Sequence, residues 1–167
     1  MDIAALHQLF LSHPRICTDT RKIEKGSIFF ALKGDNFNGN AFAEQAIQSG
    51  CSFAVIDEAK YAHTTNAILV NDVLDTLQEL ARYHRKIWNK KIIALTGSNG
   101  KTIVKEWLNQ LLQEDFHIVR SPKSYNSQIG VPLSIWQMNE RANLAVIEAG
   151  ISTRGEMEKL EPMIRPD

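Results

Sequence analysis

The feature that most constrains this chain is a glycine-containing heptapeptide, TGSNGKT, at residues 96–102. An apolar segment, Ile92–Thr96, precedes it, and residues at helical spacing follow it over Lys101–Gln113. This order predicts a strand, a tight turn and a helix. The glycines at positions 97 and 100 permit backbone angles that turn successive N–H groups toward one point, and such a turn at a helix N-terminus binds phosphate groups.

A nucleoside triphosphate, ATP, is the ligand that this turn predicts. We expect Lys101 to neutralise β- and γ-phosphate oxygens and the Thr102 hydroxyl to ligate Mg²⁺. The commonest form of the motif has a glycine at position 95, where this chain has Leu95, so the loop is the shorter TGxxGKT form. An ordinary strand–helix turn without a ligand is the alternative. The predicted ATP-binding residues are Thr96, Gly97, Ser98, Asn99, Gly100, Lys101 and Thr102.

A carboxylate is expected beside this loop. Leu144–Ile147 is a continuous apolar run, typical of a strand buried on both faces, and Glu148 ends it. Because ligands bind beyond the carboxyl ends of the strands in open α/β sheets, we expect Glu148 near the loop, where it holds Mg²⁺ directly or through water. Lys101 and Glu148 are therefore the candidate catalytic residues. The alternative is a solvated glutamate at the end of a strand.

Two α/β units are predicted, residues 1–88 and 89–167. In the first, we expect strands at Ser27–Leu32, Ser52–Asp57 and Ala67–Val70, and helices at Ile3–Leu11, Asn40–Ser49 (capped by Asn40) and Val73–Ile87. In the second, we expect strands at Ile92–Thr96, Phe116–Arg120 and Leu144–Glu148, and helices at Lys101–Gln113 and Ile129–Met138. Strands that alternate with helices predict a parallel, doubly wound sheet. Because about three strands leave an open sheet edge, we expect a longer parent protein.

Composition excludes several classes of function. The 19 basic and 19 acidic residues cancel, so nothing global attracts nucleic acid or an anionic membrane. No apolar run approaches the roughly 20 residues that a membrane-spanning helix needs. The N-terminus lacks the pattern of a signal peptide, and Cys17 and Cys51 lack CxxC spacing. We therefore expect a soluble, cytoplasmic protein with reduced thiols.

Other side chains that often carry chemistry have simpler interpretations. The five histidines show no metal-ligand spacing. Trp88, Trp107 and Trp136 fit the core faces of helices, and Phe37 is a candidate contact for a nucleobase or a loop.

Several motifs resemble the Mur ligase family. In the second unit they are TGSNGKT followed by VKEWL at 104–108, YNSQIGVPL at 125–133 and VIEAG at 146–150. In the first unit, DTR at 19–21, GSIFFALKG at 26–34 and FNG at 37–39 resemble the family's N-terminal domain, which binds a uridine nucleotide. The resemblance covers nearly the whole chain. It is strongest to the members that add D-alanyl-D-alanine to UDP-N-acetylmuramoyl-tripeptide.

The resemblance implies an ATP-dependent ligase of peptidoglycan precursor synthesis. In that reaction the tripeptide carboxylate attacks the γ-phosphate to give an acyl phosphate, and the amine of D-alanyl-D-alanine displaces phosphate. Residues 1–88 would bind the UDP-linked substrate, and residues 89–167 would form the first part of the ATP-binding domain. The implied metal ligands are Thr102 and Glu148. The implied substrate-binding residues are Thr20, Arg21, Lys33, Asn38, Asn126 and Ser127.

The chain departs from the family pattern at three places. Ile103 replaces the usual second threonine after GKT, and Asn38-Gly39-Asn40 replaces Asp-Gly-His. The usual Asn-x-Asn-Asn is Ser124–Ser127 here, which keeps only Asn126 of the three asparagines. These departures affect the substrate contacts and leave the ATP site intact.

Other functions remain open from the sequence. One is a different Mur ligase, which adds diaminopimelate or lysine, and another is a nucleotide-binding module without turnover. A folylpolyglutamate-synthase-like enzyme fits less well, because of Lys101-Thr102 and the DTR segment. Some ligases of this kind are fused to an alanine racemase, but no lysine here has a context typical of a pyridoxal phosphate site.

Overall fold

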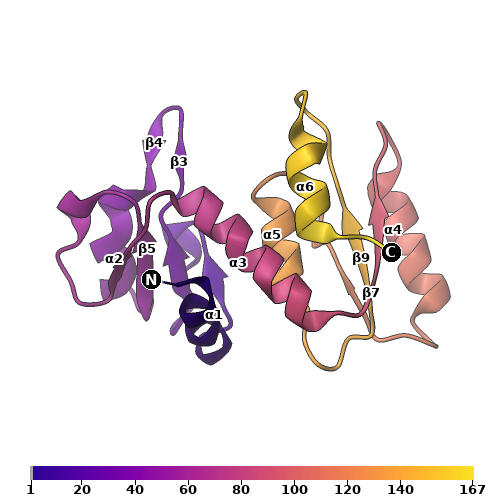
Figure 1. Cartoon of the computed structure of the whole chain (residues 1–167), viewed down its shortest axis with the longest axis horizontal. Coiled ribbons are helices and arrows are strands. Elements are labelled where there is room, and N and C mark those ends of the chain that lie inside the picture. Colours follow the sequence, from indigo (N-terminus) through magenta and orange to yellow (C-terminus); the bar gives the residue numbers. More distant parts are fainter. Residues whose placement is uncertain (1) are drawn as a thin grey trace. The chain divides into compact units, whose positions relative to one another are not determined.

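The chain forms two compact units. The computed structural model describes residues 2–167, and contacts divide the chain into Met1–Leu80 and Ala81–Asp167 (Figure 1). The division lies within the helix α3 (Val73–Trp88), so the last turns of α3 belong to the second unit. The N-terminus of α3 is capped by Asp72, whose carboxylate accepts a hydrogen bond of 2.7 Å from the backbone N–H of Asp75.

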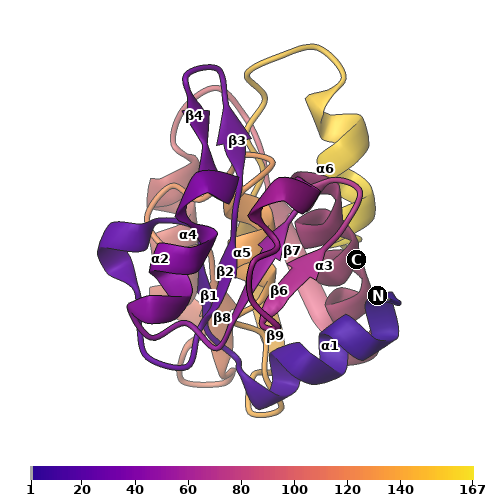
Figure 2. The same ribbon diagram turned by 90° about the vertical axis from the view of Figure 1, so that its left-hand side faces the viewer.

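The first unit contains a parallel sheet of four strands in the order β1-β2-β5-β6. These strands are β1 (Ile16–Cys17), β2 (Ile28–Phe30), β5 (Phe53–Ile56) and β6 (Ala67–Leu69). The three predicted strands are confirmed. The strand β1 was not predicted, because two residues are too few to show an alternation of apolar and polar side chains. The helix α2 (Ala43–Gln48) lies on one side of the sheet and α1 (Ile3–Ser12) on the other (Figure 2).

The core of this unit follows from the alternation of side chains along the strands. Phe29 and Ala31 point to the face covered by α2, where they belong to one buried cluster with Ala43, Ala46 and Ala54. Ile28 and Phe30 point to the opposite face and are fully buried as well. Both faces of β2 are therefore apolar, as expected of a parallel strand that helices cover on both sides.

A small hairpin follows β2, in a segment for which no strand was predicted. It consists of β3 (Lys33–Gly34) and β4 (Phe37–Asn38), which pair antiparallel. The 3-10 helix η2 (Gly39–Phe42) comes next, and the Asn38 side chain caps η2. The predicted helix cap at Asn40 is therefore wrong, because Asn40 is buried inside η2. The α-helix itself begins only at Ala43, because residues 39–42 are tied to the end of β2 through a bond from Gly39 N–H to Leu32 C=O.

The second unit contains a parallel sheet in the order β7-β9-β8. Its strands are β7 (Lys91–Leu95), β8 (Ile118–Arg120) and β9 (Leu144–Glu148). The helix α4 (Lys101–Leu112) lies on one side, and α5 (Gly130–Ile135) and α6 (Glu156–Ile164) lie on the other (Figure 1). Every residue of the central strand β9 is buried, which confirms the strand predicted from Leu144–Ile147. The predicted α/β fold with parallel sheets is thus confirmed in both units.

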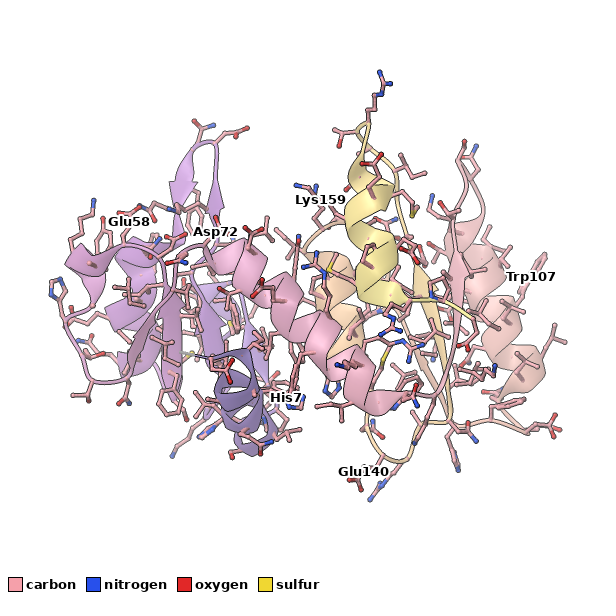
Figure 3. The ribbon with its side chains drawn as sticks, in the orientation of Figure 1. His7, Glu58, Asp72, Trp107, Glu140 and Lys159 are labelled. Carbon is pink, nitrogen blue, oxygen red and sulfur yellow. The ribbon has the colours of Figure 1, made fainter. Side chains whose placement is uncertain are left out.

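The helices of this unit differ from the prediction in two ways. The helix expected over residues 129–138 is the shorter α5, and α6 was not predicted. Trp88 and Trp136 are buried as expected, but Trp107 is 62% exposed and points away from α4 into solvent (Figure 3). The prediction for Trp107 was wrong because the buried face of α4 carries a lysine, Lys105, instead of an apolar stripe.

We predict that Gly39→Ala destabilises the first unit by about 1–3 kcal/mol, the usual cost of overpacking. A Cβ at position 39 would lie 2.4 Å from the Leu32 carbonyl oxygen and 2.6 Å from the Ala31 carbonyl carbon, and neither backbone atom can move without distorting β2. The measurement is the free energy of unfolding in urea. Gly34→Ala is the matched control, because nothing lies within 4 Å of a Cβ there. Equal stability of the two variants would contradict the packing at Gly39.

Candidate nucleotide and substrate sites

The loop between β7 and α4 has the conformation that phosphate binding requires. Residues 96–100 are exposed, and Gly97 and Gly100 have φ angles of 135° and 81°. A Cβ at Gly100 would meet no atom within 4 Å, so glycine is required there by the backbone angle and not by space. The loop leads directly into α4 at Lys101, and the free N–H groups of the first helical turn face the loop. An anion in the loop would therefore meet several N–H groups and the positive end of the helix dipole.

Lys101 and Thr102 lie at the start of α4, as the motif predicts. The ammonium group of Lys101 donates a hydrogen bond to the carbonyl oxygen of Gly97, so it folds back over the loop. The Thr102 hydroxyl lies 3.2 Å from Oε2 of Glu148 and 3.4 Å from Oγ of Ser124. Three oxygen-bearing side chains from three segments of the chain therefore meet beside the loop.

Glu148 occupies the position expected from its place at the end of β9. Leu95 and Glu148 are paired in register, so Glu148 lies opposite the last residue before the loop. Its side chain is fully buried, and its backbone N–H donates a hydrogen bond of 2.9 Å to Oγ of Ser121. A buried carboxylate requires a compensating charge.

Lys105 supplies that charge, and the sequence analysis missed it. Its ammonium lies 2.9 Å from Oε1 of Glu148, and both side chains are 0% exposed. The same ammonium donates to the carbonyl oxygens of Ser121 (2.8 Å) and Lys123 (2.6 Å). No pattern in the sequence of α4 indicates a buried lysine there, because the apolar residues Ile103 and Trp107, which a helical pattern would place inward, are exposed in the structure.

The oxygen atoms beside Thr102 fit the chemistry of Mg²⁺. This ion prefers hard oxygen ligands and is usually held by one or two carboxylates together with substrate phosphates. Thr102 and Glu148 supply a hydroxyl and a carboxylate within 3.2 Å of each other, at the mouth of the phosphate loop. Among residues 2–167 there is no cluster of three or more His, Cys, Asp or Glu side chains that would instead form an all-protein metal site.

The two predicted substrate residues of this unit lie nearby in the segment after β8. The carbonyl oxygen of Asn126 accepts a hydrogen bond of 2.7 Å from the N–H of Gly150, two residues beyond Glu148. A Cβ at Gly150 would come within 3.0 Å of the Asn126 side chain, so glycine permits this close approach. The hydroxyl of Ser127 accepts from the N–H of Gly130 at the start of α5, which gives Ser127 a structural function as well.

The four predicted substrate residues of the first unit lie at one edge of its sheet. Thr20 and Arg21 form η1 (Thr20–Lys22) after β1, and Lys33 and Asn38 lie in the hairpin after β2. The carboxyl ends of parallel strands meet at the same edge, where α/β sheets bind ligands. The structure therefore brings these residues to the edge at which a ligand is expected.

Lys33 is the most firmly positioned of these cations. Its side chain is 44% exposed, and its ammonium lies 2.9 Å from Oδ1 of Asp57, which follows β5 and is almost completely buried. Glu58 lies 3.5 Å away on the same side. The hydrogen bond to Asp57 raises the pKa of Lys33. Burial alone would raise the pKa of Asp57, but hydrogen bonds from Lys33, from Asn40 and from the N–H of Val73 outweigh it, and the pKa is lowered.

Arg21 is held more loosely. Its side chain is 86% exposed, and its guanidinium donates hydrogen bonds of 2.9 and 2.8 Å to the two oxygens of Asp19. These bonds and the backbone N–H of Arg21 lower the pKa of Asp19 to about 2. The arginine is therefore available to an anion only if it leaves Asp19 or binds both carboxylate and ligand.

Asn38 and Asn40 form a connected amide network in place of the Asp and His of the family pattern. Nδ2 of Asn40 donates to Oδ1 of Asn38 and to Oδ1 of Asp57, and its Oδ1 accepts from the N–H of Asp57. Nδ2 of Asn38 in turn donates to Glu58. Asn40 was not predicted as a site residue, but it joins the hairpin to the end of β5.

Two descriptions of Mur ligase domains match this chain. Residues 15–85 match the description "Mur ligase family, catalytic domain", and residues 95–167 match "Mur ligase middle domain". No helix of the described residues 2–167 is long and apolar enough to cross a membrane.

Among curated proteins, the chain is 36% identical to UDP-N-acetylmuramoyl-tripeptide–D-alanyl-D-alanine ligase of Bacillus subtilis, over 91% of this chain and 34% of that protein. It is 33% identical to the ligase of the same name from Escherichia coli, over 91% of this chain and 33% of the ligase. The chain thus spans about a third of the length of these relatives.

Solved structures give the same result. A crystal structure of MurF from Acinetobacter baumannii superimposes with a TM-score of 0.85 and 29% identity, over 95% of this chain and 38% of that one. A MurF ligase from Thermotoga maritima in complex with ADP superimposes with a TM-score of 0.83 and 28% identity, over 93% of this chain and 36% of that one. The two Mur ligase matches follow each other along the chain in the order of its two units, and this chain belongs to the Mur ligase family.

Proposed function

We propose that this chain contributes two binding functions to a ligase that adds D-alanyl-D-alanine to UDP-N-acetylmuramoyl-tripeptide. Residues 1–88 bind the UDP-linked substrate, and residues 89–167 bind the phosphates of ATP. The names of the curated relatives support this choice over a diaminopimelate- or lysine-adding ligase. The ADP complex of the similar Thermotoga maritima ligase supports the nucleotide.

One observation carries the proposal: the phosphate loop and Glu148 meet at Thr102. The loop has the backbone angles for an anion, and the Glu148 carboxylate lies 3.2 Å from the Thr102 hydroxyl. A loop that only connected a strand to a helix would not need a buried carboxylate at its mouth. Both features are explained if the polyphosphate of ATP and its cation bind here.

The chemistry requires a carboxylate to become an electrophile. A carboxylate oxygen of the tripeptide attacks the γ-phosphorus, ADP leaves, and the resulting acyl phosphate has a good leaving group. The amine of D-alanyl-D-alanine then attacks the acyl carbon and displaces phosphate. The protein contributes positioning and charge neutralisation: Lys101 and the loop N–H groups hold the phosphates, and Thr102 and Glu148 hold Mg²⁺. When bound, Mg²⁺ supplies positive charge to the phosphate oxygens.

The first unit suits a ligand with a diphosphate and several polar groups. Lys33 and Arg21 supply the positive charges, and Thr20 and Asn38 supply a hydroxyl and an amide at the same sheet edge. Asp57 keeps the Lys33 ammonium at this edge. Asn126 and Ser127, near Glu148, are the substrate contacts that this proposal assigns to the second unit. Because ATP and UDP-linked precursors are intracellular metabolites, we also propose that the ligase acts in the cytoplasm.

We predict that Lys101→Ala weakens MgATP binding by about tenfold or more, because it removes the only positive side chain within the TGSNGKT loop. Isothermal titration calorimetry on the folded chain is the measurement. Lys159→Ala on α6 is the control and should bind MgATP like the wild type. Unchanged affinity of Lys101→Ala would refute the ATP site.

We predict that UDP-N-acetylmuramoyl-tripeptide shifts amide NMR resonances of Thr20–Asn40 and of Asp57 and Glu58, without requiring ATP. The reason is that these residues surround the proposed UDP site at the carboxyl edge of the first sheet. Lys33→Ala should weaken the titration about tenfold, because a charge-assisted hydrogen bond is lost. Lys86→Ala, at an exposed position of α3 outside this edge, is the control. Shifts confined to other parts of the chain would contradict the assignment.

We predict that Asp57→Asn lowers the free energy of unfolding at pH 7 by about 1.5 kcal/mol or more, because a hydrogen bond to a charged group is lost. The pKa of Asp57 lies below its ordinary value of 3.8 in the folded protein. Its ionised form therefore stabilises the wild type fully above pH 3.8, and this contribution is lost as the pH falls through the lowered folded value. Urea unfolding from pH 8 to pH 3 should show a constant difference that narrows only below about pH 4. A difference that narrows already between pH 8 and pH 5 would contradict the lowered pKa.

A further inference from the structure

Lys105 is the most unusual charged residue of the second unit. Lysine is almost never fully buried unless it is paired, yet Lys105 is 0% exposed in the middle of the first two turns of α4. It lies three residues after Thr102, so both side chains project from the same face of the helix. The phosphate-loop motif does not require a lysine at this position.

The ammonium of Lys105 is fully occupied by oxygen atoms of three segments. It donates to the carbonyl oxygens of Ser121 and Lys123 and lies 2.9 Å from Oε1 of Glu148, with Oε1 of Glu106 at 3.3 Å. Lys123 has a φ angle of 49°, a left-handed conformation that is unfavourable for residues other than glycine. Its carbonyl nevertheless lies 2.6 Å from the ammonium, so the turn is held in a strained conformation that points an oxygen at Lys105.

This arrangement divides the carboxylate of Glu148 between two partners. Oε1 faces Lys105, and Oε2 faces the Thr102 hydroxyl at 3.2 Å. The backbone N–H of Glu148 is also fixed, by Ser121, whose carbonyl in turn binds Lys105. Only one oxygen of the carboxylate is therefore directed toward the phosphate loop.

We infer that Lys105 is a positioning residue that reserves Oε1 of Glu148 for itself, so that a cation at Thr102 takes the carboxylate through Oε2 alone and Mg²⁺ is selected over Ca²⁺. The inference rests on the proposed ATP site. Mg²⁺ demands a compact octahedral shell and is usually held by one or two carboxylates, whereas Ca²⁺ takes six to eight oxygens and often binds a carboxylate through both of them. A lysine at Oε1 blocks the binding of a cation through both carboxylate oxygens and leaves binding through Oε2 alone.

Lys105→Gln tests this selection, because glutamine keeps N–H donors but removes the charge that holds Oε1. The measurement is ATP affinity by calorimetry in Mg²⁺, in Ca²⁺ and in EDTA. We expect the ratio of Mg²⁺-supported to Ca²⁺-supported affinity to fall about tenfold, the size of effect seen when the partner of a metal ligand is removed. Lys159→Gln is the matched control and should keep the wild-type ratio. A folded Lys105→Gln chain with an unchanged ratio would overturn the inference and leave the ATP site standing.

The outcome for the wild type separates the two proposals. If the wild type binds ATP equally well in Mg²⁺ and in EDTA, the proposed metal site itself is wrong.

If Lys105→Gln does not fold, Glu148→Gln is compared with the double variant Lys105→Met/Glu148→Gln, in which no buried charge is left unpaired between these two residues. Because Lys105 is inferred to act through Glu148, these two variants should show the same ratio of Mg²⁺-supported to Ca²⁺-supported ATP affinity. A further change in the ratio on removal of the lysine would show that it acts by another route and would overturn the inference.

Discussion

The parallel register of the strands is the constraint on which both sites depend. In the second unit β7 pairs with β9 so that Leu95 lies opposite Glu148, and the N–H of Ala149 donates to the carbonyl of Leu95. A shift of one residue would turn the Glu148 side chain to the other face of the sheet, because side chains alternate along a strand. In the first unit the same geometry collects η1, the hairpin and Asp57 at one edge.

The two units hold a charge near their candidate anion sites in different ways. In the second unit, Lys105 and Glu148 are both fully buried, so each is needed to compensate for the desolvation of the other. In the first unit, Lys33 is nearly half exposed and only its partner Asp57 is buried. A lysine on this exposed side can still reach a ligand, whereas Lys105 is enclosed by oxygens of the protein and acts only through the residues it holds.

The departures from the family pattern have a structural explanation in the first unit. Asn38 and Asn40 bond to each other through their amide groups, and Asn40 also uses both its donor and its acceptor on Asp57. An amide can donate and accept at the same time, so Asn40 connects η2 to the end of β5 without carrying a charge. Asp57 remains ionised and paired with Lys33, and the cation that the proposed UDP site needs is retained.

The sequence by itself determined the fold class, the phosphate loop and the position of Glu148. These follow from local rules: glycine spacing sets the backbone angles of the loop, and an apolar run that ends in a glutamate sets the end of a buried strand. The tertiary structure alone decided which oxygens of Glu148 are free, that Lys105 rather than Trp107 lies on the inward face of α4, and that Asn40 binds Asp57 instead of capping a helix. The physical reason is that a buried polar group must find partners, and several of these lie far away in the chain. Ser121 and Glu148 are 16 and 43 residues from Lys105, and Asp57 is 17 residues from Asn40, so no local pattern can show these contacts.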